Sequence, residues 1–323
     1  MKITIIGSGA WGTSLALVAH RAQNEVNIYS RNNNTCTEIN QKHSNYKYLA
    51  NIILPKDIKA SSDLAIALEA DILLLTTPAQ TIRQICINLA QLKLSPKTII
   101  VICAKGIEQD SLKLMSEVVA EILPVNPIAI LSGPNFALEI AQNLPTITSI
   151  ASLDKKLASQ LSKIFSSYNF RVYSNEDIIG TQIIGAAKNV LAIATGISMG
   201  KKLGENAKAA ILSRGIVEIN QLILAKGGKM QTLLSPAGIG DINLTCSSST
   251  SRNTSYGIAL ATTKPTTNNQ LVEGFYTAKS ISMLAISMNV EMPICTAIHQ
   301  ITHLNYPIDQ VIKELLRRSI KLL

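Results

Sequence analysis

The first half of the chain alternates short apolar runs with segments of helical periodicity. Strands are predicted over 2–6, 25–30, 71–76, 98–103, 128–132, 146–151 and 169–174. Helical patterns lie between several of them, from a glycine-rich turn to about Arg21 and near 63–69, 79–91 and 111–122. Strands spaced by helices favour a parallel sheet that is covered on both faces. Uninterrupted runs such as LLL and IIVI are typical of strands buried on both sides.

From about Asn175 onward, helical periodicity dominates the pattern. Helices are predicted over 177–199, 206–225, 233–247, 253–263, 272–289, 293–304 and 307–320. Pro307 is well placed to open the last of these. A chain of 323 residues also suits two domains better than one. We therefore predict an α/β N-terminal domain over 1–179 and a mostly α-helical C-terminal domain over 180–323.

Composition indicates a folded, basic protein. Hydrophobic residues make up 47% of the chain and charged residues 16%, which provides ample material for a packed core. The formal charge of +9 favours an anionic partner, either nucleic acid, a membrane surface or a small phosphorylated ligand. Nucleic acid is the weaker choice, because the basic residues are dispersed and aromatic residues for base stacking are only 4%. A dispersed excess of lysine is also typical of a solvated surface.

Cysteine usage and apolar segments bear on compartment and metal binding. The five cysteines are an odd number without a CxxC pair or metal-like spacing, so we expect no metal and a reducing cytoplasm. The N-terminus begins a strand at Lys2 without a charged leader or cleavage site. No stretch reaches ~18 uninterrupted apolar residues, so we expect no integral membrane segment. The sequence therefore predicts a cytoplasmic protein.

A glycine-rich turn follows the first predicted strand and opens a helix. It reads G-S-G-A-W-G, with Gly7, Gly9 and Gly12 at the spacing of a dinucleotide-binding fingerprint. The first glycine permits the tight turn, the second lets the backbone approach a pyrophosphate, and the third lets helix and strand pack closely. The helix N-terminus offers unpaired N–H groups to the anion. In this position between strand and helix, the motif predicts nucleotide binding.

The end of the second predicted strand bears on the choice of dinucleotide. An NAD site usually carries an acidic residue there, whereas this chain reads S-R-N over 30–32. Arg31 could pair with the 2′-phosphate of NADP and stack beside adenine. It could also be an ordinary surface charge after a strand. We predict binding of NADP(H), or of both NADP(H) and NAD(H).

The segment GAAKNVLAIATGI over 185–197 predicts an apolar helix interrupted by two polar residues. At about 100° per residue, Gly185, Lys188, Asn189, Ala192 and Gly196 fall on one strip of its surface. Gly and Ala on that strip leave room beside the lysine for something other than protein. We therefore expect Lys188 to face a substrate as a candidate general base. The alternative is a lysine that extends along a helix–helix seam.

Further polar motifs follow predicted strands or helices. Lys105 lies in AKGIE at 104–108, after a strand whose carboxyl end is a usual ligand position. SGPNFA at 132–137 predicts a rigid turn with exposed backbone. AGIGD at 237–241 and SRN at 251–253 complete the set. Taken alone, each has an ordinary explanation, as a surface lysine, a turn, a helix cap or a polar loop.

Together these motifs resemble the glycerol-3-phosphate dehydrogenase family in its bacterial NAD(P)-dependent form. The resemblance runs through essentially the whole chain in the order GSGAWG, AKGIE, SGPNFA, GAAKNVLAIATGI, AGIGD, SRN and VEG, the last at 272–274. It implies a Rossmann-type N-terminal domain, a helical C-terminal domain and an active site in the cleft between them. It also implies a small phosphorylated substrate and a homodimer.

The resemblance implies a role for each matching residue. Lys188 would be the proton acceptor, supported by Asn189, Asp241 and Thr245. The implied cofactor-binding residues are Gly7, Ser8, Gly9, Trp11, Gly12, Arg31, Lys105, Ala137, Arg252, Leu271 and Glu273. The implied substrate-binding residues are Lys105, Gly133, Asn135, Lys188, Asn189, Asp241, Thr245, Ser251, Arg252 and Asn253.

The chain departs from the family pattern in three places. Many bacterial members follow SRN with further arginines, whereas Thr254 and Ser255 follow here, which weakens the positive field near the phosphate. Asn135 stands where Ser or Thr is frequent, so the role of its side chain is left open. The segment after Asp241 reads INLT, less apolar than the corresponding run in the family.

The implied reaction is reversible reduction of dihydroxyacetone phosphate to sn-glycerol 3-phosphate by NAD(P)H, which supplies the backbone of glycerophospholipids. A lysine serves as proton acceptor only when its pKa falls from roughly 10.4 toward neutrality. One alternative is another two-domain NADP-dependent hydroxyacid or ketopantoate-type dehydrogenase, against which SGPNFA and SRN speak. A catalytically silent nucleotide sensor or nucleic-acid-binding protein is a third reading, and it predicts salt-sensitive binding without turnover.

Overall fold

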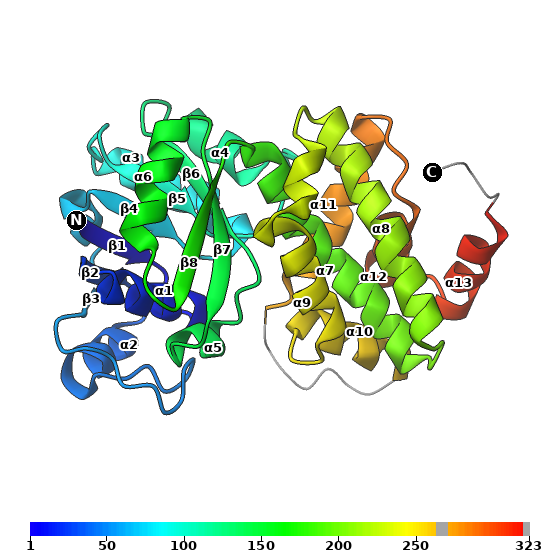
Figure 1. The fold of residues 1–323 in the computed structure, drawn as a ribbon, viewed down its shortest axis with the longest axis horizontal. Coiled ribbons are helices and arrows are strands. Elements are labelled where there is room, and N and C mark those ends of the chain that lie inside the picture. Colours follow the sequence, from blue (N-terminus) through cyan, green and yellow to red (C-terminus); the bar gives the residue numbers. More distant parts are fainter. Residues whose placement is uncertain (263–270, 319–323) are drawn as a thin grey trace. The chain divides into compact units, whose positions relative to one another are not determined.

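The structure, a computed structural model, describes residues 1–262 and 271–318. The chain forms two compact units (Figure 1). Unit 1 contains residues 1–104 and 115–178, and unit 2 contains residues 105–114 and the chain from 179 onward. The segment 105–114 belongs to unit 2, although a division at 180 would place it with the first domain. The reason is apolar burial, because Ile107 and Leu114 are part of the core of unit 2.

Unit 1 is built on a sheet with the strand order β3-β2-β1-β4-β5-β6-β7-β8 among the described residues. The strands are β1 (Lys2–Ile6), β2 (Glu25–Tyr29), β3 (Lys59–Ser61), β4 (Ile72–Leu75), β5 (Ile99–Ile102), β6 (Ile128–Ser132), β7 (Thr146–Ala151) and β8 (Phe170–Asn175). Every strand that the apolar runs predict is present to within a residue at each end. Strand β3 was not predicted, because its three residues, KAS, carry no apolar run.

The predicted parallel sheet is present, with one antiparallel pairing near an edge. Strands β1 to β6 pair in parallel, but β7 is antiparallel to β6, and β8 then runs parallel to β7. The connection from β6 to β7 contains only α5 (Ala137–Ala141). That helix is about 8 Å long, too short to carry the chain back along the strand, as a parallel crossover requires. The longer α6 (Lys155–Phe165) makes the parallel connection from β7 to β8.

Alternating strand positions supply two separate hydrophobic cores. In β4, Ile72 and Leu74 face one core, while Leu73 and Leu75 face the other. The helices α1 (Ala10–Arg21), α5 and α6 cover the first face, and α3 (Ile82–Gln91) and α4 (Met115–Ile122) cover the second. The central strands are therefore buried on both sides, as their uninterrupted apolar runs predict.

Short helical segments complete unit 1. They are α2 (Asn33–Thr37), η1 (Glu38–Lys42), η2 (Leu64–Glu69) and η3 (Ala79–Thr81). The sequence pattern did not assign α2, α5 or α6. Asp154 caps α6, since its carboxylate accepts the backbone N–H groups of Lys156 and Leu157. That signal, an acidic residue just before an amphipathic stretch, is readable in the sequence.

Unit 2 is helical among its described residues. Its helices are α7 (Ile178–Gly200), α8 (Glu205–Ala225), η4 (Met230–Leu234), η5 (Pro236–Gly240), α9 (Asp241–Ser247), α10 (Arg252–Thr262), α11 (Glu273–Ser287), α12 (Pro293–His303) and α13 (Ile308–Arg317). The ends of two predicted helices, residue 263 and residues 319–320, lie outside the described residues. The fold class, an α/β Rossmann-type unit with a mostly helical second unit, is confirmed.

The predicted helix over 233–247 is broken in the structure. Gly238 has a non-helical backbone (φ −91°, ψ −109°), and η5 ends before α9 begins at Asp241. A Cβ atom at Gly238 would lie 2.1 Å from the carbonyl oxygen of Leu233, so only glycine permits this close approach. The break lies just before Asp241 and therefore sets the position of its Cα atom.

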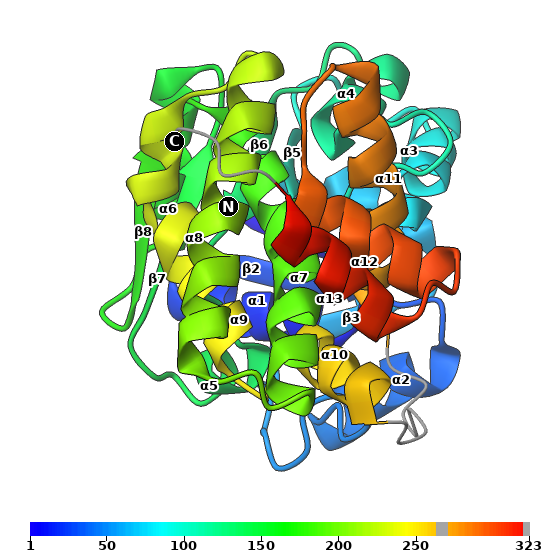
Figure 2. The same cartoon turned by 90° about the vertical axis from the view of Figure 1, so that its right-hand side faces the viewer.

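Helix α7 runs through the middle of unit 2, with other helices of the unit around it (Figure 2). Every residue from Gly180 to Ser198 is buried. Among the described residues, α7 is the one helix long and apolar enough to cross a membrane, judged by length and composition alone. Because 89% of its apolar window is buried inside the protein, α7 is a core helix.

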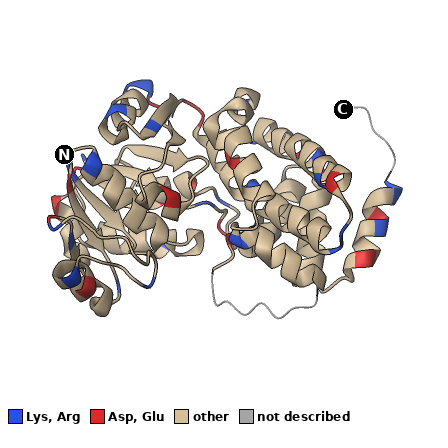
Figure 3. Cartoon of the chain, turned by 60° about the horizontal axis from the view of Figure 1, so that its bottom comes forward, with Lys and Arg blue, Asp and Glu red and all other residues tan. Residues whose placement is uncertain are grey.

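Charged residues are spread over the surface of each unit. Lysine and arginine positions occur on several helices and loops, with acidic positions among them (Figure 3). Several of these charges are paired, for example Arg83 with Glu121 in unit 1 and Lys201 with Asp309 in unit 2. The dispersed pattern is typical of a solvated surface and differs from the continuous basic stripe of a nucleic-acid-binding face.

Candidate functional site

The glycine turn of unit 1 has the geometry that close phosphate approach requires. Gly7 adopts φ +120°, a conformation that other residues rarely reach. A Cβ atom at Gly12 would lie 2.0 Å from the carbonyl oxygen of Gly7, so helix α1 and strand β1 meet with no room for a side chain. At Gly9, by contrast, a Cβ atom would meet nothing within 4 Å. The turn therefore leaves open space over Gly9, at the N-terminus of α1, where a pyrophosphate fits.

The end of β2 lies beside this turn. The hydroxyl groups of Ser8 and Ser30 are 2.6 Å apart, which ties the turn to the position where NAD sites usually carry an acidic residue. Asn32 uses its side-chain oxygen to cap α2. Arg31, which lies between Ser30 and Asn32, is exposed, and its guanidinium forms no hydrogen bond or ion pair with the described residues. The residues present fit a dinucleotide, with an arginine available for its adenosine end.

The turn after β6 holds an amide in a fixed orientation. Asn135 donates its Nδ2 hydrogen to Thr148 Oγ1 at 2.9 Å, and Thr148 donates to the carbonyl oxygen of Ser132 at 3.1 Å. The Oδ1 atom of Asn135 is buried and has no hydrogen-bond partner among the described residues. Ala137 begins α5, and its carbonyl oxygen accepts a hydrogen bond from Ser14 of α1 at 2.6 Å. The turn therefore presents an unused acceptor on an element anchored to the glycine-turn helix.

Unit 2 brings three charged side chains together. Lys188 Nζ donates to Asp241 Oδ1 at 2.5 Å and to Thr245 Oγ1 at 2.6 Å. Lys105 Nζ donates to the other carboxylate oxygen, Oδ2, at 2.5 Å. The side chains of Lys188, Asp241 and Lys105 are 8%, 1% and 18% exposed. One buried carboxylate is thus shared by two ammonium groups, an arrangement that we call the lysine cluster.

The lysine cluster makes proton release from an ammonium group easier. Burial, above all, lowers the pKa of Lys105 to about 8; Asp241 raises it, and the positive charge of Lys188 lowers it. A single carboxylate can neutralise only one of the two ammonium groups. The cluster therefore retains a net positive charge while both lysines are protonated. Such a cluster can give up a proton near neutral pH and also attracts an anion.

Three separate elements deliver the side chains of the lysine cluster. Lys188 comes from the middle of the buried helix α7, and Asp241 is the first residue of α9. Lys105 is carried by the segment 105–114, in which Ile107 and Leu114 form an isolated antiparallel bridge. Both of these apolar residues are fully or nearly fully buried in the core of unit 2. The segment therefore holds Lys105 against Asp241 through apolar packing.

Two asparagines link α7 with the start of α10. Asn253 donates from Nδ2 to Asn189 Oδ1 at 3.0 Å and accepts the backbone N–H of Gly274 at its own Oδ1, at 2.9 Å. A Cβ atom at Gly274 would lie 2.6 Å from the carbonyl oxygen of Asn189, so α11 approaches α7 at the distance that only glycine allows. The residue beside Lys188 is thus tied directly to the SRN motif.

The start of α10 offers donors for an anion. Ser251 is buried and accepts the backbone N–H of Thr254 at 3.4 Å, which caps the helix. Arg252 is the exposed first residue, and it forms no hydrogen bond or ion pair with the rest of the described chain. A helix N-terminus with an available guanidinium fits a phosphate group.

Two further predicted residues lie at or just before the start of α11, in unit 2. Glu273 is the first residue of that helix, and Leu271 lies two positions before it, half-buried. No group of three or more His, Cys, Asp or Glu side chains that could hold a metal ion occurs in the described ranges 1–262 and 271–318.

Comparison with known proteins identifies the family. The N-terminal model of NAD-dependent glycerol-3-phosphate dehydrogenase matches residues 2–158, and the C-terminal model matches residues 177–313. The chain belongs to the NAD-dependent glycerol-3-phosphate dehydrogenase family. Glycerol-3-phosphate dehydrogenase [NAD(P)+] of Parvibaculum lavamentivorans is 41% identical, over 99% of this chain and 97% of that protein. The solved glycerol-3-phosphate dehydrogenase of Coxiella burnetii superposes with a TM-score of 0.93 at 38% identity, covering 98% of this chain and 99% of that one.

The ketopantoate-type alternative matches only at the level of fold. A ketopantoate reductase from Ralstonia eutropha superposes with a TM-score of 0.65 at 15% identity, covering 97% of this chain and 100% of that one. Identity this low shows a shared architecture and nothing about the substrate. The glycerol-3-phosphate dehydrogenase family is therefore supported over this alternative.

The prediction that the strip of α7 faces open space is wrong at Gly196. A Cβ atom at Gly196 would lie 2.2 Å from the carbonyl oxygen of Thr254, so this glycine lets α10 pack against α7. Gly257 on α10 makes the reciprocal approach, since a Cβ atom there would lie 2.2 Å from the carbonyl oxygen of Ile193. Lys188 contacts Asp241 and Thr245, two of the residues that the family resemblance assigns to its support.

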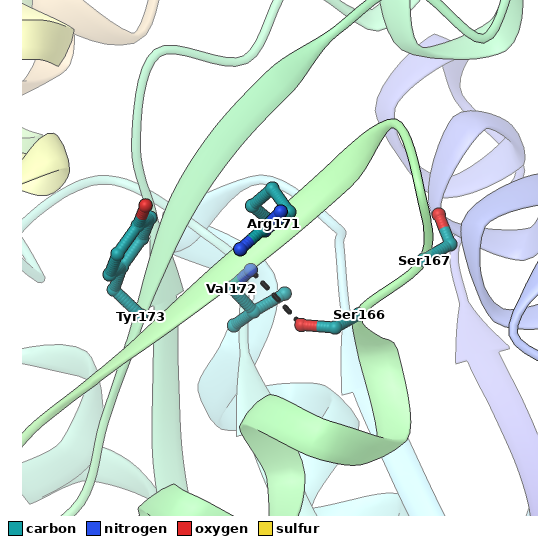
Figure 4. A pocket seen from close by; sticks show the side chains of 5 residues that line it. All are labelled: Ser166, Ser167, Arg171, Val172 and Tyr173. Carbon is teal, nitrogen blue, oxygen red and sulfur yellow. Dashed lines mark hydrogen bonds between the residues drawn. The ribbon is translucent and has the colours of Figure 1, made fainter.

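Unit 1 has a hollow beside its last strand, β8. It is lined by Ser166, Ser167, Arg171, Val172 and Tyr173, at the turn from α6 into β8 (Figure 4). The backbone N–H of Val172 donates to Ser166 Oγ at 3.2 Å, so a hydroxyl already satisfies the strand edge there. Because β8 is the last strand in the sheet order and β1 lies several strands further in, the hollow is not part of the glycine turn.

Proposed function

We propose that the chain catalyses the reversible reduction of dihydroxyacetone phosphate to sn-glycerol 3-phosphate with NAD(P)H. The observation that carries the proposal is the lysine cluster, in a member of a family whose relatives bear the corresponding name. The product is a secondary alcohol that supplies the backbone of glycerophospholipids. A small phosphorylated substrate also suits a site that combines buried lysines with the start of α10.

In this proposal Lys188 is the proton acceptor and donor. When bound, the nicotinamide ring supplies or takes up the hydride at C2 of the substrate. Loss of that hydride from the alcohol requires loss of the hydroxyl proton, and Lys188 Nζ accepts it; in the reductive direction, the ammonium donates it to the carbonyl oxygen. The ammonium has three N–H donors, and its described partners, Asp241 and Thr245, take two of them. The third is available for the substrate oxygen.

Asp241 and Thr245 orient the ammonium in this proposal. The carboxylate accepts one hydrogen bond from Lys188 and the hydroxyl accepts another, which fixes the direction of the third N–H. Lys105 shares the same carboxylate and adds a second positive charge, which we assign to the substrate and the dinucleotide. Two ammonium groups on one carboxylate favour a state in which one lysine has lost its proton.

The phosphate is assigned to the start of α10. Arg252 donates two parallel hydrogen bonds from its planar guanidinium, and the N-terminal backbone of α10 adds further N–H donors. Ser251 and Asn253 line this position, and Asn253 also sets the distance to α7 through Asn189. Gly133 and Asn135 of the β6 turn complete the proposed substrate contacts. For Asn135, the orphaned Oδ1 atom is the group that would accept a hydrogen bond.

The dinucleotide is assigned to the glycine turn. Gly7, Gly9 and Gly12 shape the turn, and the open space over Gly9 accommodates the pyrophosphate. Arg31 would bind the 2′-phosphate of NADP, while Ser8 and Trp11 line the same turn. Further contacts are proposed from Lys105, Ala137, Arg252, Leu271 and Glu273. We propose binding of NADP(H) or of both dinucleotides, which accords with the bracketed NAD(P)+ in the names of the relatives.

We also propose that the enzyme acts in the cytoplasm as a homodimer. All five cysteines are free and buried, as suits a reducing compartment. The homodimer rests on the family resemblance. Light scattering during gel filtration tests it, since a homodimer has twice the mass of the 34.8 kDa chain and a monomer peak would overturn it.

The experiment that tests the function is an absorbance assay with dihydroxyacetone phosphate, run in parallel with NADH and NADPH. Ketopantoate replaces the substrate in a matched cuvette. The proposal predicts turnover of dihydroxyacetone phosphate only, with a lower KM for NADPH than for NADH that reverses or levels in Arg31→Ala. Turnover of ketopantoate alone, or of neither substrate, would overturn it.

Arg252→Ala tests the phosphate site in the same assay, and an unchanged KM for dihydroxyacetone phosphate would remove Arg252 from that role.

A further inference from the structure

Thr254 is a fully buried polar residue for which the proposed chemistry gives no direct role. It is the third residue of α10, directly after the SRN motif, and it is 0% exposed. Its hydroxyl donates to the backbone carbonyl oxygen of Thr245 at 2.8 Å. A buried hydroxyl with a partner from another helix fixes the distance between those helices, because breaking the bond leaves two buried polar groups unsatisfied.

The residue that Thr254 holds is itself part of the lysine cluster's environment. Thr245 lies in the last part of α9, and its own hydroxyl contacts Lys188 Nζ at 2.6 Å and Asp241 Oδ1 at 3.3 Å. A carbonyl and a side chain of one residue share the same Cα atom. Moving the carbonyl of Thr245 therefore moves its hydroxyl, and a shift of about 1 Å takes a 2.6 Å contact beyond hydrogen-bond distance.

Thr254 is equally fixed to the proposed phosphate site. Its backbone N–H donates to the Ser251 hydroxyl, and the preceding residue, Asn253, bonds to the side chain of Asn189. The carbonyl oxygen of Thr254 lies so close to α7 that a Cβ atom at Gly196 would be only 2.2 Å from it. The backbone at this position is therefore held between the SRN motif and α7, while its hydroxyl reaches α9.

We propose that Thr254 is a positioning residue that couples occupation of the phosphate site at the start of α10 to alignment of the Thr245 hydroxyl with Lys188. The inference rests on the proposed function, in which Arg252 holds the phosphate and Lys188 moves the proton. Binding of the phosphate orders the start of α10, and the bond from Thr254 to Thr245 carries that ordering to the group that orients the ammonium. A side chain without a hydroxyl at position 254 would leave α10 and α9 packed, but without the hydrogen bond that joins them.

Thr195 shows why the coupling is assigned to Thr254. Thr195 is also fully buried, and it donates to the carbonyl oxygen of Cys246 at 3.1 Å, one residue beyond Thr245. It comes from α7, the helix that carries Lys188, so it anchors α9 without reaching the SRN motif. The last turn of α9 is thus held from two sides. Among these two threonines, only Thr254 adjoins the phosphate-binding residues.

The test compares Thr254→Val with Thr254→Ser in steady-state reduction of dihydroxyacetone phosphate by NADPH. Valine keeps the shape and removes the donor, whereas serine keeps the donor. We expect Thr254→Val to lower kcat by about tenfold and to raise KM for dihydroxyacetone phosphate severalfold, with KM for NADPH unchanged. Thr254→Ser should stay within about twofold of the wild type. The matched control is Thr302→Val, which removes a hydroxyl-to-carbonyl bond of 2.7 Å within α12 and should change neither constant.

A double-mutant cycle with Thr245→Val distinguishes an effect of Thr254 through the Thr245 hydroxyl from a general loss of helix packing. If Thr254 acts through the Thr245 hydroxyl, Thr254→Val lowers kcat no further once that hydroxyl is absent. Equal tenfold losses in both backgrounds would overturn the coupling, as would wild-type kcat and KM accompanied only by a lower Tm. Thr254→Ala carries the same prediction if the valine variant is insoluble. Failure of the proposed function is distinguishable, because the wild type itself would then not reduce dihydroxyacetone phosphate with either nucleotide.

Discussion

Replacing Asp241 with asparagine should move the pH dependence of the oxidation reaction toward acid. The carboxylate bonds Lys188 through one oxygen and Lys105 through the other, each at 2.5 Å. The amide removes the negative charge while keeping the size of the side chain. The pKa of Lys105, lowered by burial to about 8 with Asp241 present, should fall further, because burial and the neighbouring Lys188 charge remain while the carboxylate no longer raises it.

The size of the expected pKa shift follows from Coulomb's law. Two unit charges about 4 Å apart interact by about 4 kcal/mol at an effective dielectric constant near 20, which corresponds to about 3 pH units. The carboxylate charge is divided between two oxygens and two partners, so we expect the acidic limb of the profile to move by about 1 to 3 pH units. The maximal kcat should also fall, because the ammonium of Lys188 loses the partner that orients it.

The assay is kcat/KM for glycerol 3-phosphate oxidation between about pH 5 and pH 10, because the free enzyme's essential groups set the limbs of this profile. Asp309→Asn is the matched control, because Asp309 pairs with Lys201 at 2.8 Å but is 70% exposed, and its removal should leave the profile in place. An Asp241→Asn profile that coincides with the wild type, or that moves toward alkaline pH, would refute the shared-carboxylate reasoning.

Three further changes test separate parts of the structure. Lys105→Met removes the group of the lysine cluster whose pKa is lowered to about 8, so the acidic limb that Asp241→Asn moves should be lost from the same pH profile, and a limb that stays near pH 8 would contradict this. Gly196→Ala places a Cβ atom 2.2 Å from the Thr254 carbonyl and should lower Tm by several degrees, measured by calorimetry against Gly9→Ala, where space is open. Burial raises the pKa of Glu218 to about 7, so its native carboxyl holds a proton that the unfolded chain releases above about 4.5. The contribution of Glu218 to the free energy of unfolding is fully present below about pH 4.5. It falls by about 3 kcal/mol as the pH rises from about 4.5 through about 7. Urea unfolding at about pH 5 and about pH 8 should show a smaller difference in Glu218→Gln than in the wild type, and equal differences would exclude the effect.

Local patterns predicted most of unit 1. The central strands β4 and β5 appear where uninterrupted apolar runs occur, because burial on both faces demands apolar residues at every position. The reversal at β7 could not be predicted in the same way. Strand direction depends on whether the connecting helix is long enough to cross the sheet, and α5 was not visible as a helix in the sequence. Strand β3, with three residues, owes its existence to pairing with β2 and not to its own composition.

The sequence names candidate residues for the site but does not give the contacts between them. The glycine spacing alone indicates a tight turn, an open position and a close helix contact, and the structure has each of these at Gly7, Gly9 and Gly12. The lysine cluster joins residues 53 and 136 positions apart, so no local pattern contains it. Family resemblance brought Lys105, Lys188 and Asp241 together in one set without saying that one carboxylate bonds both lysines.

The strip of small residues on α7 shows what helical periodicity cannot predict, namely the group that packs against a helix face. Small residues on a helix face indicate close approach, but the pattern does not say whether a ligand or another helix approaches. At Gly196 it is the backbone of α10, and at Lys188 it is the carboxylate of α9. Thr254 was visible in the sequence only as a departure from the family's arginines. Its partner, the Thr245 carbonyl, is nine positions away and can be identified only in three dimensions.

The most direct test of the proposed mechanism is Lys188→Met, assayed for dihydroxyacetone phosphate reduction together with NADPH binding by fluorescence titration. In this mechanism Lys188 of unit 2 acts at the reacting oxygen, while the dinucleotide is assigned to the glycine turn of unit 1. We therefore expect kcat to fall by about 10²- to 10⁴-fold while the Kd for NADPH stays within about twofold of the wild type. Turnover at the wild-type rate in Lys188→Met would contradict the central claim that this lysine moves the proton.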